Sequence, residues 1–226
     1  MLISDEIIEK YPNTSFGLMS AYHLDSGPDQ QAWEKLRDEE INAFRSSLPD
    51  FDRKKAALTQ PLAGYMQYYK RFKKTYPVLL QMESVLLKQK DLHSASLAVE
   101  VMFLAEVKNG LLVAGHDLAE LSGDYALKVA KGDEELMVVS GQCRKLKEGD
   151  IFMADGRRIL SSVLEGQDFQ SRLTENSSEA IYCVYGMEGV GPEQFEKFFQ
   201  DLKRYIQVAF PSAHFNEVSI FRAGKA

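Results

Sequence analysis

His116 is the histidine best placed to do chemistry, because it follows an apolar run and Gly115 and is followed directly by Asp117. An imidazole at such a position can orient a water or a ribose hydroxyl. The simpler interpretation is a histidine in a turn, beside an aspartate that caps a helix. Both interpretations place His116 at the end of a strand, so this segment is the first candidate for a site.

The other metal-binding or nucleophilic residues form no local motif. No histidine lies within four positions of another, and the two cysteines, Cys143 and Cys183, have no CxxC spacing. We therefore predict no metal site, and we expect both cysteines to be reduced, buried thiols. A GxSxG elbow, a phosphate-binding glycine loop and an HExxH helix are also absent from the sequence.

Positive charge is local in a chain whose net charge is −6. Nonspecific binding to nucleic-acid phosphates needs clustered positive charge, so only a local basic face can bind RNA, and DNA binding is not expected. One of three basic clusters, formed by Lys70, Arg71, Lys73 and Lys74, is interleaved with an aromatic stripe that runs from Tyr65 to Tyr76. Stacking of bases on this stripe is one interpretation; a buried helix face with lysines reaching out to solvent is the favoured one.

Periodicity divides the chain into a helical part and a strand-rich part. We predict a strand over 15–24, helices over 28–49, 61–76, 77–89 and 96–110, then six short strands between 111 and 186. A helix over 191–210 and a strand over 217–221 close the chain. Helices, then many short strands, then a helix indicate an α+β fold.

Length and composition favour a single domain over residues 1–226 in the cytoplasm. The chain is 45% hydrophobic and 27% charged, as in soluble globular proteins. No apolar run is long enough to cross a bilayer, and the first residues are acidic where a secretory signal is basic. The oligomeric state stays open.

Four segments in order resemble a known family. They are YYKRFKKTYPVLLQMESVLL, GHDLAELSGDYALKVAKGDEEL, VSGQCRKLKEGDIFMADG and RRILSSVLEGQDFQSRLTENSSEAIYCVYG. They resemble freestanding proteins of the B-three/B-four type, which are similar to the editing domain of the phenylalanyl-tRNA synthetase beta subunit. The resemblance covers residues 62–186 and plausibly extends to 212.

This resemblance implies a fold, a reaction and a partner. The implied fold has three layers, with a mixed or antiparallel, sandwich-like sheet core flanked by helices. The implied reaction is hydrolysis of the ester in a mischarged aminoacyl-tRNA, with water as the nucleophile and no metal or organic cofactor. The implied partner is the aminoacylated 3′ end of a tRNA. The alternative is a non-catalytic RNA- or amino-acid-binding module with the same fold.

The resemblance also suggests site residues. The family's pocket histidine corresponds to Ala114 here, and His116 is its near neighbour on the same strand face. The predicted cleft faces residues 114–117 and 162–174. The predicted catalytic residues are His116, Glu165 and Arg172. The predicted substrate-binding residues are Asp117, Gly166, Thr174 and Cys183. The predicted RNA-binding residues are Lys70, Arg71, Lys73, Lys74, Arg157 and Arg158.

Overall fold

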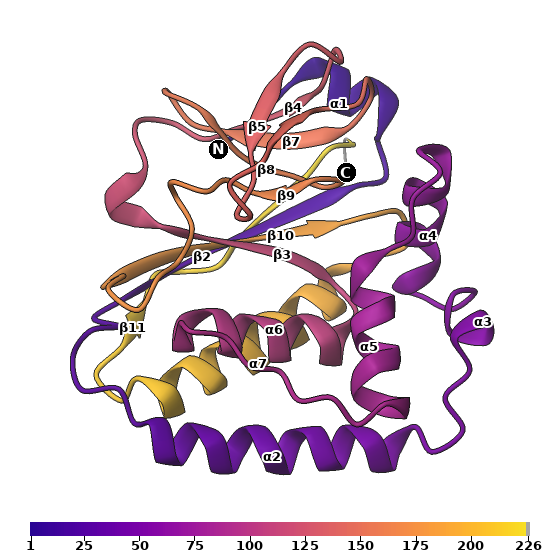
Figure 1. Cartoon of the computed structure of the whole chain (residues 1–226). Helices are drawn as coiled ribbons and strands as arrows, with labels where there is room; N and C mark the ends of the chain where they lie inside the picture. Colours follow the sequence, from indigo (N-terminus) through magenta and orange to yellow (C-terminus); the bar gives the residue numbers. More distant parts are fainter. Residues whose placement is uncertain (225–226) are drawn as a thin grey trace.

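The computed structural model describes residues 1–224 and has the α+β class and layered core predicted from the sequence. Figure 1 shows a small upper sheet, a longer lower sheet beneath it, and helices below the lower sheet. The two sheets share one hydrophobic core with the helical layer. The lower sheet is thus covered by the upper sheet on one face and by helices on the other.

The lower sheet is antiparallel, with the order β11-β2-β10-β3 and β12 paired to β2. Its strands are β2 (Ser15–Tyr22), β3 (Leu112–Asp117), β10 (Glu179–Gly186), β11 (His214–Phe215) and β12 (Ser219–Arg222). β10 is buried along seven of its eight residues, because sheet and helices cover its two faces. β3 forms one edge of this sheet, and its outer backbone groups need partners from elsewhere.

The upper sheet has the order β1-β4-β7-β8-β9, with the hairpin β5-β6 beside it. Its strands are β1 (Leu2–Ile3), β4 (Ala126–Val129), β7 (Ile151–Ala154), β8 (Ile159–Ser162) and β9 (Gly166–Gln167). The hairpin consists of β5 (Glu135–Met137) and β6 (Cys143–Lys145). Glycines with left-handed φ, such as Gly149 and Gly166, make the tight turns that the sequence predicted between these short strands.

The helices pack around both sheets, and most of them do so through apolar residues. They are α1 (Asp5–Lys10), α2 (Gln30–Ser47), α3 (Arg53–Ala56), α4 (Leu62–Arg71), α5 (Pro77–Leu87), α6 (Leu97–Asn109) and α7 (Pro192–Ala209). α6 and α7 lie under the sheet, with α2 below them (Figure 1). The rings of Phe195 and Phe199 press on the glycines of the sheet: a Cβ at Gly17 would lie 2.6 Å from Phe199.

The aromatic stripe of α4 belongs to the core. Tyr65, Tyr68, Tyr69 and Tyr76 are at most 2% exposed, so the base-stacking interpretation is wrong and the buried-helix interpretation is confirmed. The helix ends earlier than predicted, at Arg71, because Lys73 takes a left-handed φ of 56°. Tyr76 still joins the stripe: its ring stacks on that of Tyr65 with 4.4 Å between centroids.

The two cysteines differ in exposure, and one of them departs from the sequence prediction. Cys183 is buried as expected, but Cys143 is exposed on β6, because both faces of that short hairpin strand are open to solvent.

No helix within residues 1–224 combines the length and apolar character that crossing a bilayer requires. Among the same residues, no three His, Cys, Asp or Glu side chains converge as metal ligands do.

Candidate functional site

A cavity of about 390 Å³ lies where the upper sheet meets the edge of β3. Its walls come from α5, α6, β3, β8, β9, β10 and the segment after β9. We call it the β3 cavity. It is lined by Pro77, Gln81, Ser94, Val99, Met102, Phe103, Glu106, Leu112, Val113, Ala114, Val139, Ser161, Ser162, Gly166, Gln167, Arg172, Leu173 and Tyr185. Most of these side chains are apolar, which is typical of a site for a small organic ligand.

A chain of hydrogen bonds forms one polar wall of the β3 cavity. The hydroxyls of Tyr185 and Ser161 are 2.6 Å apart, and Ser161 Oγ lies 3.1 Å from His116 Nε2. On the far side of the ring, His116 Nδ1 lies 3.0 Å from Ser171 Oγ. Tyr185 and His116 belong to the lower sheet and Ser161 to the upper one, so these bonds join the two sheets.

Burial keeps this network neutral. His116 is fully buried, and burial lowers its pKa to about 3. Burial also raises the pKa of the Tyr185 phenol well above its ordinary value. At neutral pH the imidazole is uncharged, so one ring nitrogen accepts a hydrogen bond and the other donates one. A histidine with so low a pKa is a weak base, and its main capacity is to orient the Ser161 hydroxyl.

Glu106 and Gln81 supply two further polar groups. Glu106 Oε1 accepts a hydrogen bond of 3.1 Å from the backbone nitrogen of Val113, at the free edge of β3. Burial raises the Glu106 pKa to about 8, so the group is mostly protonated at neutral pH and can donate a hydrogen bond. Gln81 Oε1 is buried and has no hydrogen-bond partner among the described residues. A buried acceptor of this kind favours a ligand that donates to it.

Arg172 is the cationic residue of the β3 cavity. Its guanidinium carbon lies 3.8 Å from the centroid of the Phe169 ring, and its Nη1 donates to the Phe169 carbonyl. Residues His116 and Arg172 also form an isolated antiparallel bridge, which fixes the arginine backbone beside β3. The side chain is thus held in place while its remaining donors stay available for an anionic group.

The structure brings together some of the predicted catalytic and substrate-binding residues and separates others. Both predicted segments contribute to the β3 cavity, through Ala114 on one side and Ser162, Gly166 and Arg172 on the other. His116 lies one hydrogen bond behind the wall, next to Ser161. Glu165 does not line the cavity; its carboxylate pairs with Lys74, which is itself a predicted RNA-binding residue.

The remaining predicted substrate-binding residues lie away from the β3 cavity. Asp117 Oδ1 accepts from the Ala119 nitrogen at 3.0 Å and caps the short 3₁₀ helix Leu118–Glu120. Thr174 lines a different cavity, beside residues 94–98. Cys183 is fully buried within the lower sheet, and burial raises its pKa to about 12, so it remains a thiol.

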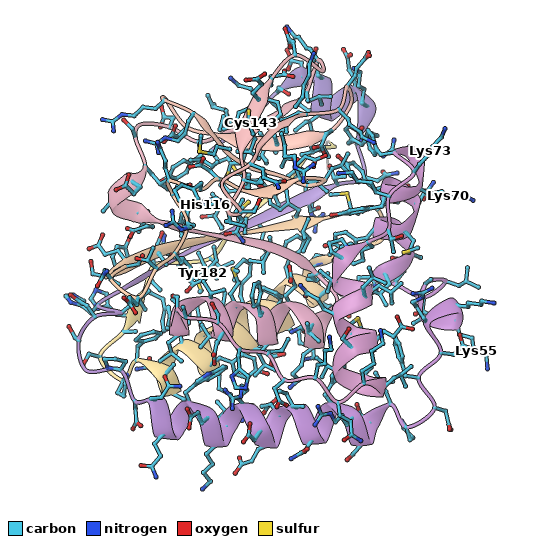
Figure 2. All side chains as sticks on the ribbon, in the orientation of Figure 1. Lys55, Lys70, Lys73, His116, Cys143 and Tyr182 are labelled. Atoms are coloured by element: carbon cyan, nitrogen blue, oxygen red, sulfur yellow. The ribbon has the colours of Figure 1, made fainter. Side chains whose placement is uncertain are left out.

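The predicted RNA-binding residues come from two regions. Lys70, Arg71 and Lys73 are exposed at the end of α4, and Lys70 and Lys73 project outward in Figure 2. Arg157 and Arg158 lie in the turn between β7 and β8, where their backbone nitrogens donate to Asp155. Arg158 also lies 3.8 Å from Asp168 and donates to Gln170, so its charge is partly compensated.

The polar side chains of Gln81, Glu106, Ser161 and Tyr185 in the β3 cavity were not anticipated from the sequence. The sequence did contain a signal for Glu106, because a glutamate inside the apolar run LAVEVMFLAEV costs free energy to bury unless it is protonated or hydrogen-bonded. The two adjacent serines in the apolar strand Ile159–Ser162 were a weaker signal. Tyr185 stands among other apolar strand residues and gave none.

Comparisons with known proteins include a weak likeness to a solved structure. No protein-family model matches the chain, and no curated protein matches it. The fold is similar to the crystal structure of an N-terminal fragment of the phenylalanyl-tRNA synthetase beta-subunit from Pyrococcus horikoshii, with a TM-score of 0.48 and 9% sequence identity. The similarity covers 95% of this chain and 49% of that one, so the chain spans about half the length of that fragment. A likeness at this level carries no conclusion about function.

Proposed function

We propose that this protein binds the aminoacylated 3′ end of a tRNA and takes the amino-acid side chain into the β3 cavity. The observation that carries the proposal is the cavity itself, with apolar walls, a hydroxyl pair and one arginine. Its volume of about 390 Å³ is at the small end of the range for ligand sites, which suits a group of amino-acid size. The tRNA part of the proposal rests on the four sequence segments described above.

Different walls of the β3 cavity would contact different parts of the ligand. Val99, Met102 and Phe103 of α6 would contact the apolar portion of the side chain. Protonated Glu106 and the free oxygen of Gln81 would read a polar group on the ligand. Arg172 would hold a phosphate of the terminal nucleotides.

A test of binding compares charged with uncharged tRNA. Val139 is 50% exposed and lines the cavity, so Val139→Trp should fill its entrance without disturbing the core. We expect the wild-type protein to prefer some member of an aminoacyl-tRNA panel over the matching uncharged tRNA, and Val139→Trp to lose that preference. Met137→Trp is the matched control, because Met137 is 47% exposed on the same hairpin but lies outside the cavity. If Val139→Trp and Met137→Trp prefer the aminoacyl-tRNA over the uncharged tRNA equally, the β3 cavity does not bind the amino-acid side chain.

Hydrolysis of the ester is the second candidate function, favoured by the contact of 3.1 Å between Ser161 Oγ and His116 Nε2. A water held by the Ser161 and Tyr185 hydroxyls would attack the ester carbonyl carbon. The bond from that carbon to the ribose oxygen would break, the ribose oxygen would take a proton, and a free amino acid would leave. His116 would keep Ser161 oriented, and the hydroxyls would stabilise the charge that develops on the carbonyl oxygen.

The rate of ester loss distinguishes the two functions. If the protein is a hydrolase, it accelerates deacylation of at least one aminoacyl-tRNA. Ser161→Ala and Tyr185→Phe should then each slow that reaction about a hundredfold, the usual effect of losing a positioned transition-state contact. Selective binding without acceleration across the panel would leave the binding function alone. Acceleration that survives both substitutions would show that other groups carry out the reaction.

A further inference from the structure

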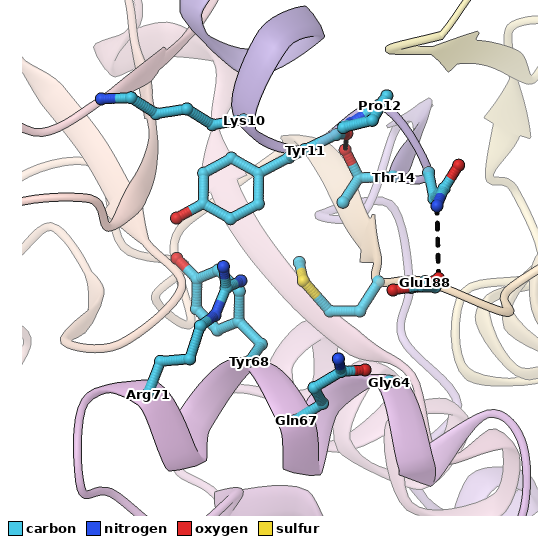
Figure 3. A pocket seen from close by; sticks show the side chains of 11 residues that line it. Lys10, Tyr11, Pro12, Thr14, Gly64, Gln67, Tyr68, Arg71 and Glu188 are labelled. Atoms are coloured by element: carbon cyan, nitrogen blue, oxygen red, sulfur yellow. Dashed lines mark hydrogen bonds between the residues drawn. The ribbon is translucent and has the colours of Figure 1, made fainter.

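A second cavity, of about 210 Å³, lies between the α1–β2 connection, helix α4 and the residues that follow β10 (Figure 3). We call it the α4 cleft. Residues 10–14 form one side, Gly64, Gln67, Tyr68 and Arg71 form another, and Met187 and Glu188 complete it. It shares no lining residue with the β3 cavity.

Arg71 is held in a fixed position at one end of the α4 cleft. Its guanidinium carbon lies 4.9 Å from the centroid of the Tyr11 ring and 5.1 Å from that of Tyr68. Both rings are anchored, because Tyr11 donates to the Gly149 carbonyl and Tyr68 donates to Asp150 Oδ1 at 2.7 Å. Two aromatic faces therefore orient the arginine before any ligand arrives.

Arg71 forms no ion pair within the part of the chain that the structure describes. Among residues 1–224, no carboxylate oxygen lies within 4.0 Å of a side-chain nitrogen of Arg71 or of Lys10, the second cation lining the cleft. An oriented guanidinium, in a cleft that a lysine also lines, complements the geometry and charge of a phosphate group.

The opposite side of the α4 cleft has different chemistry. Glu188 lies across the cleft from Arg71 in Figure 3, and its Oε1 accepts from Asn13 Nδ2 at 3.2 Å. The exposed amide of Gln67 lines the space between these groups. Gly64 lets α4 approach this side closely, since a Cβ there would lie 2.0 Å from the Glu188 carbonyl oxygen. A carboxylate and amides in this arrangement can accept from and donate to sugar hydroxyls.

We infer that the α4 cleft binds a ribose phosphate, with the phosphate on Arg71 and Lys10 and the sugar hydroxyls on Glu188 and Gln67. Acidic side chains read ribose hydroxyls in other nucleotide sites, and the 2′-hydroxyl separates RNA from DNA. A stacked base is excluded as the ligand, because Arg71 occupies the Tyr11 and Tyr68 faces and both rings are buried. The cleft volume also suits one sugar phosphate better than a whole nucleotide.

Two sources can supply this chemistry: a nucleotide unit in an RNA backbone and a free sugar phosphate. The first deepens the proposed function and rests on it, because it would add a second contact for a bound tRNA. The second is independent of that function. Both sources predict the same contacts with Arg71, Lys10 and Glu188, so a single set of variants tests them.

The experiment is a titration followed by backbone amide NMR, with ribose 5-phosphate, 2-deoxyribose 5-phosphate and inorganic phosphate as separate ligands. We expect ribose 5-phosphate to shift the amides of Gly64, Gln67 and Glu188 and to bind more tightly than the other two. Lys10→Gln and Arg71→Gln should each weaken its binding about tenfold, as the loss of a charged hydrogen bond does. Lys35→Gln, which removes an exposed lysine of α2, should leave binding unchanged.

A third variant tests the sugar contact. Glu188→Gln should reduce the preference for ribose over deoxyribose while phosphate binding persists. The inference is overturned if no ligand shifts these amides, or if inorganic phosphate binds as tightly as ribose 5-phosphate. Since Lys10 is exposed, its variant keeps the test valid even if Arg71→Gln disturbs the packing of the two tyrosines.

Competition identifies the source. If uncharged tRNA displaces ribose 5-phosphate from the amides of the α4 cleft, the RNA backbone is the ligand. If tRNA fails to displace it, a free sugar phosphate is the ligand. Failure of the proposed function would be visible separately, as absence of shifts at Val113 and Leu173 of the β3 cavity when aminoacyl-tRNA is added.

Discussion

Glu106 is a carboxyl group held among apolar side chains, and its ionisation opposes folding. Its pKa is about 8 in the folded protein against an ordinary value of 4.5. Between these values the unfolded chain has lost the proton that the folded chain retains. The Glu106 contribution to the free energy of unfolding is therefore full below pH 4.5, falls as pH rises towards 8, and is constant above that.

Glu106→Gln should remove this dependence, because glutamine is neutral at every pH and can still accept from the Val113 nitrogen. Relative to the wild type, the variant should gain stability as pH rises from about 4.5 to about 8. Urea unfolding of both proteins across this range measures the gain. A stability difference that does not change with pH would show that Glu106 ionises freely in the folded state.

The effect of pH on stability through His116 is opposite to that through Glu106. Its folded-state pKa of about 3 lies below the ordinary 6.5, so the contribution of neutral His116 is present above pH 6.5 and is lost as pH falls towards 3. His116→Leu should cost about 1–3 kcal/mol at pH 7, since Ser161 and Ser171 lose a buried partner. The stability gap from the wild type should narrow at pH 5, as urea unfolding would reveal.

Gly64 shows how an element is positioned by one missing methyl group. Alanine favours helices by up to about 1 kcal/mol over glycine. A Cβ at this position would nevertheless lie 2.0 Å from a backbone oxygen, which cannot move aside as a flexible side chain would. Gly64→Ala should therefore destabilise the protein by about 1–3 kcal/mol or more.

Thermal and urea unfolding would measure this effect. Lys70→Ala in the same helix is the control, because Lys70 is exposed and its removal should change stability by less than about 0.5 kcal/mol. A Gly64→Ala variant as stable as the wild type would mean that α4 can shift away from residue 188 at little cost.

The longer elements were predictable because each carries a repeated signal. β10 (Glu179–Gly186) is the last of the six predicted short strands and ends at residue 186 as predicted, since a long run of apolar strand formers ends at glycine. α6 ends at Gly110, whose φ of 65° is the left-handed cap that its sequence indicated. The two- and three-residue strands β1, β6, β9 and β11 were not predicted. Segments of this length are too short to show an alternation of apolar and polar side chains, and such strands form only beside a neighbouring strand.

Part of the site was predictable from polar segments that contain a glycine. Gly166 and Arg172 stand in polar, glycine-marked segments, and both reach the β3 cavity. Gln81, Glu106 and Tyr185 come from two helices and a central strand, so their convergence depends on how α5 and α6 pack against β3 and β10. Local pattern does not encode that packing. The pairing of Glu165 with Lys74 is a similar long-range contact.

The whole molecule is acidic, with a net charge of −6, so any RNA must meet a local basic surface. Reversing two exposed charges with Lys70→Glu and Lys73→Glu should weaken tRNA binding. It should also reduce the slope of log affinity against log salt by about 1–2, the share of one or two phosphates. Binding measured from low to moderate salt tests this.

The control reverses two exposed lysines elsewhere, Lys35→Glu on α2 and Lys88→Glu just after α5, which keeps the change in net charge the same. The slope should then remain that of the wild type. If both double variants behave alike, overall charge and not the α4 surface governs binding, and Arg157 and Arg158 become the next residues to test.

The position of β10 between β2 and β3 has a consequence for the newly made chain. β2 is synthesised first and β3 much later, yet neither touches the other in the lower sheet without β10. During synthesis on a ribosome, neither strand can therefore pair with β10 until residues 179–186 emerge, and the apolar faces of both strands stay uncovered until then. The local helices α5 and α6 can form meanwhile, but the lower sheet is complete only once β10, β11 and β12 have emerged. Such distant pairing slows folding and leaves the nascent chain dependent on protection from aggregation.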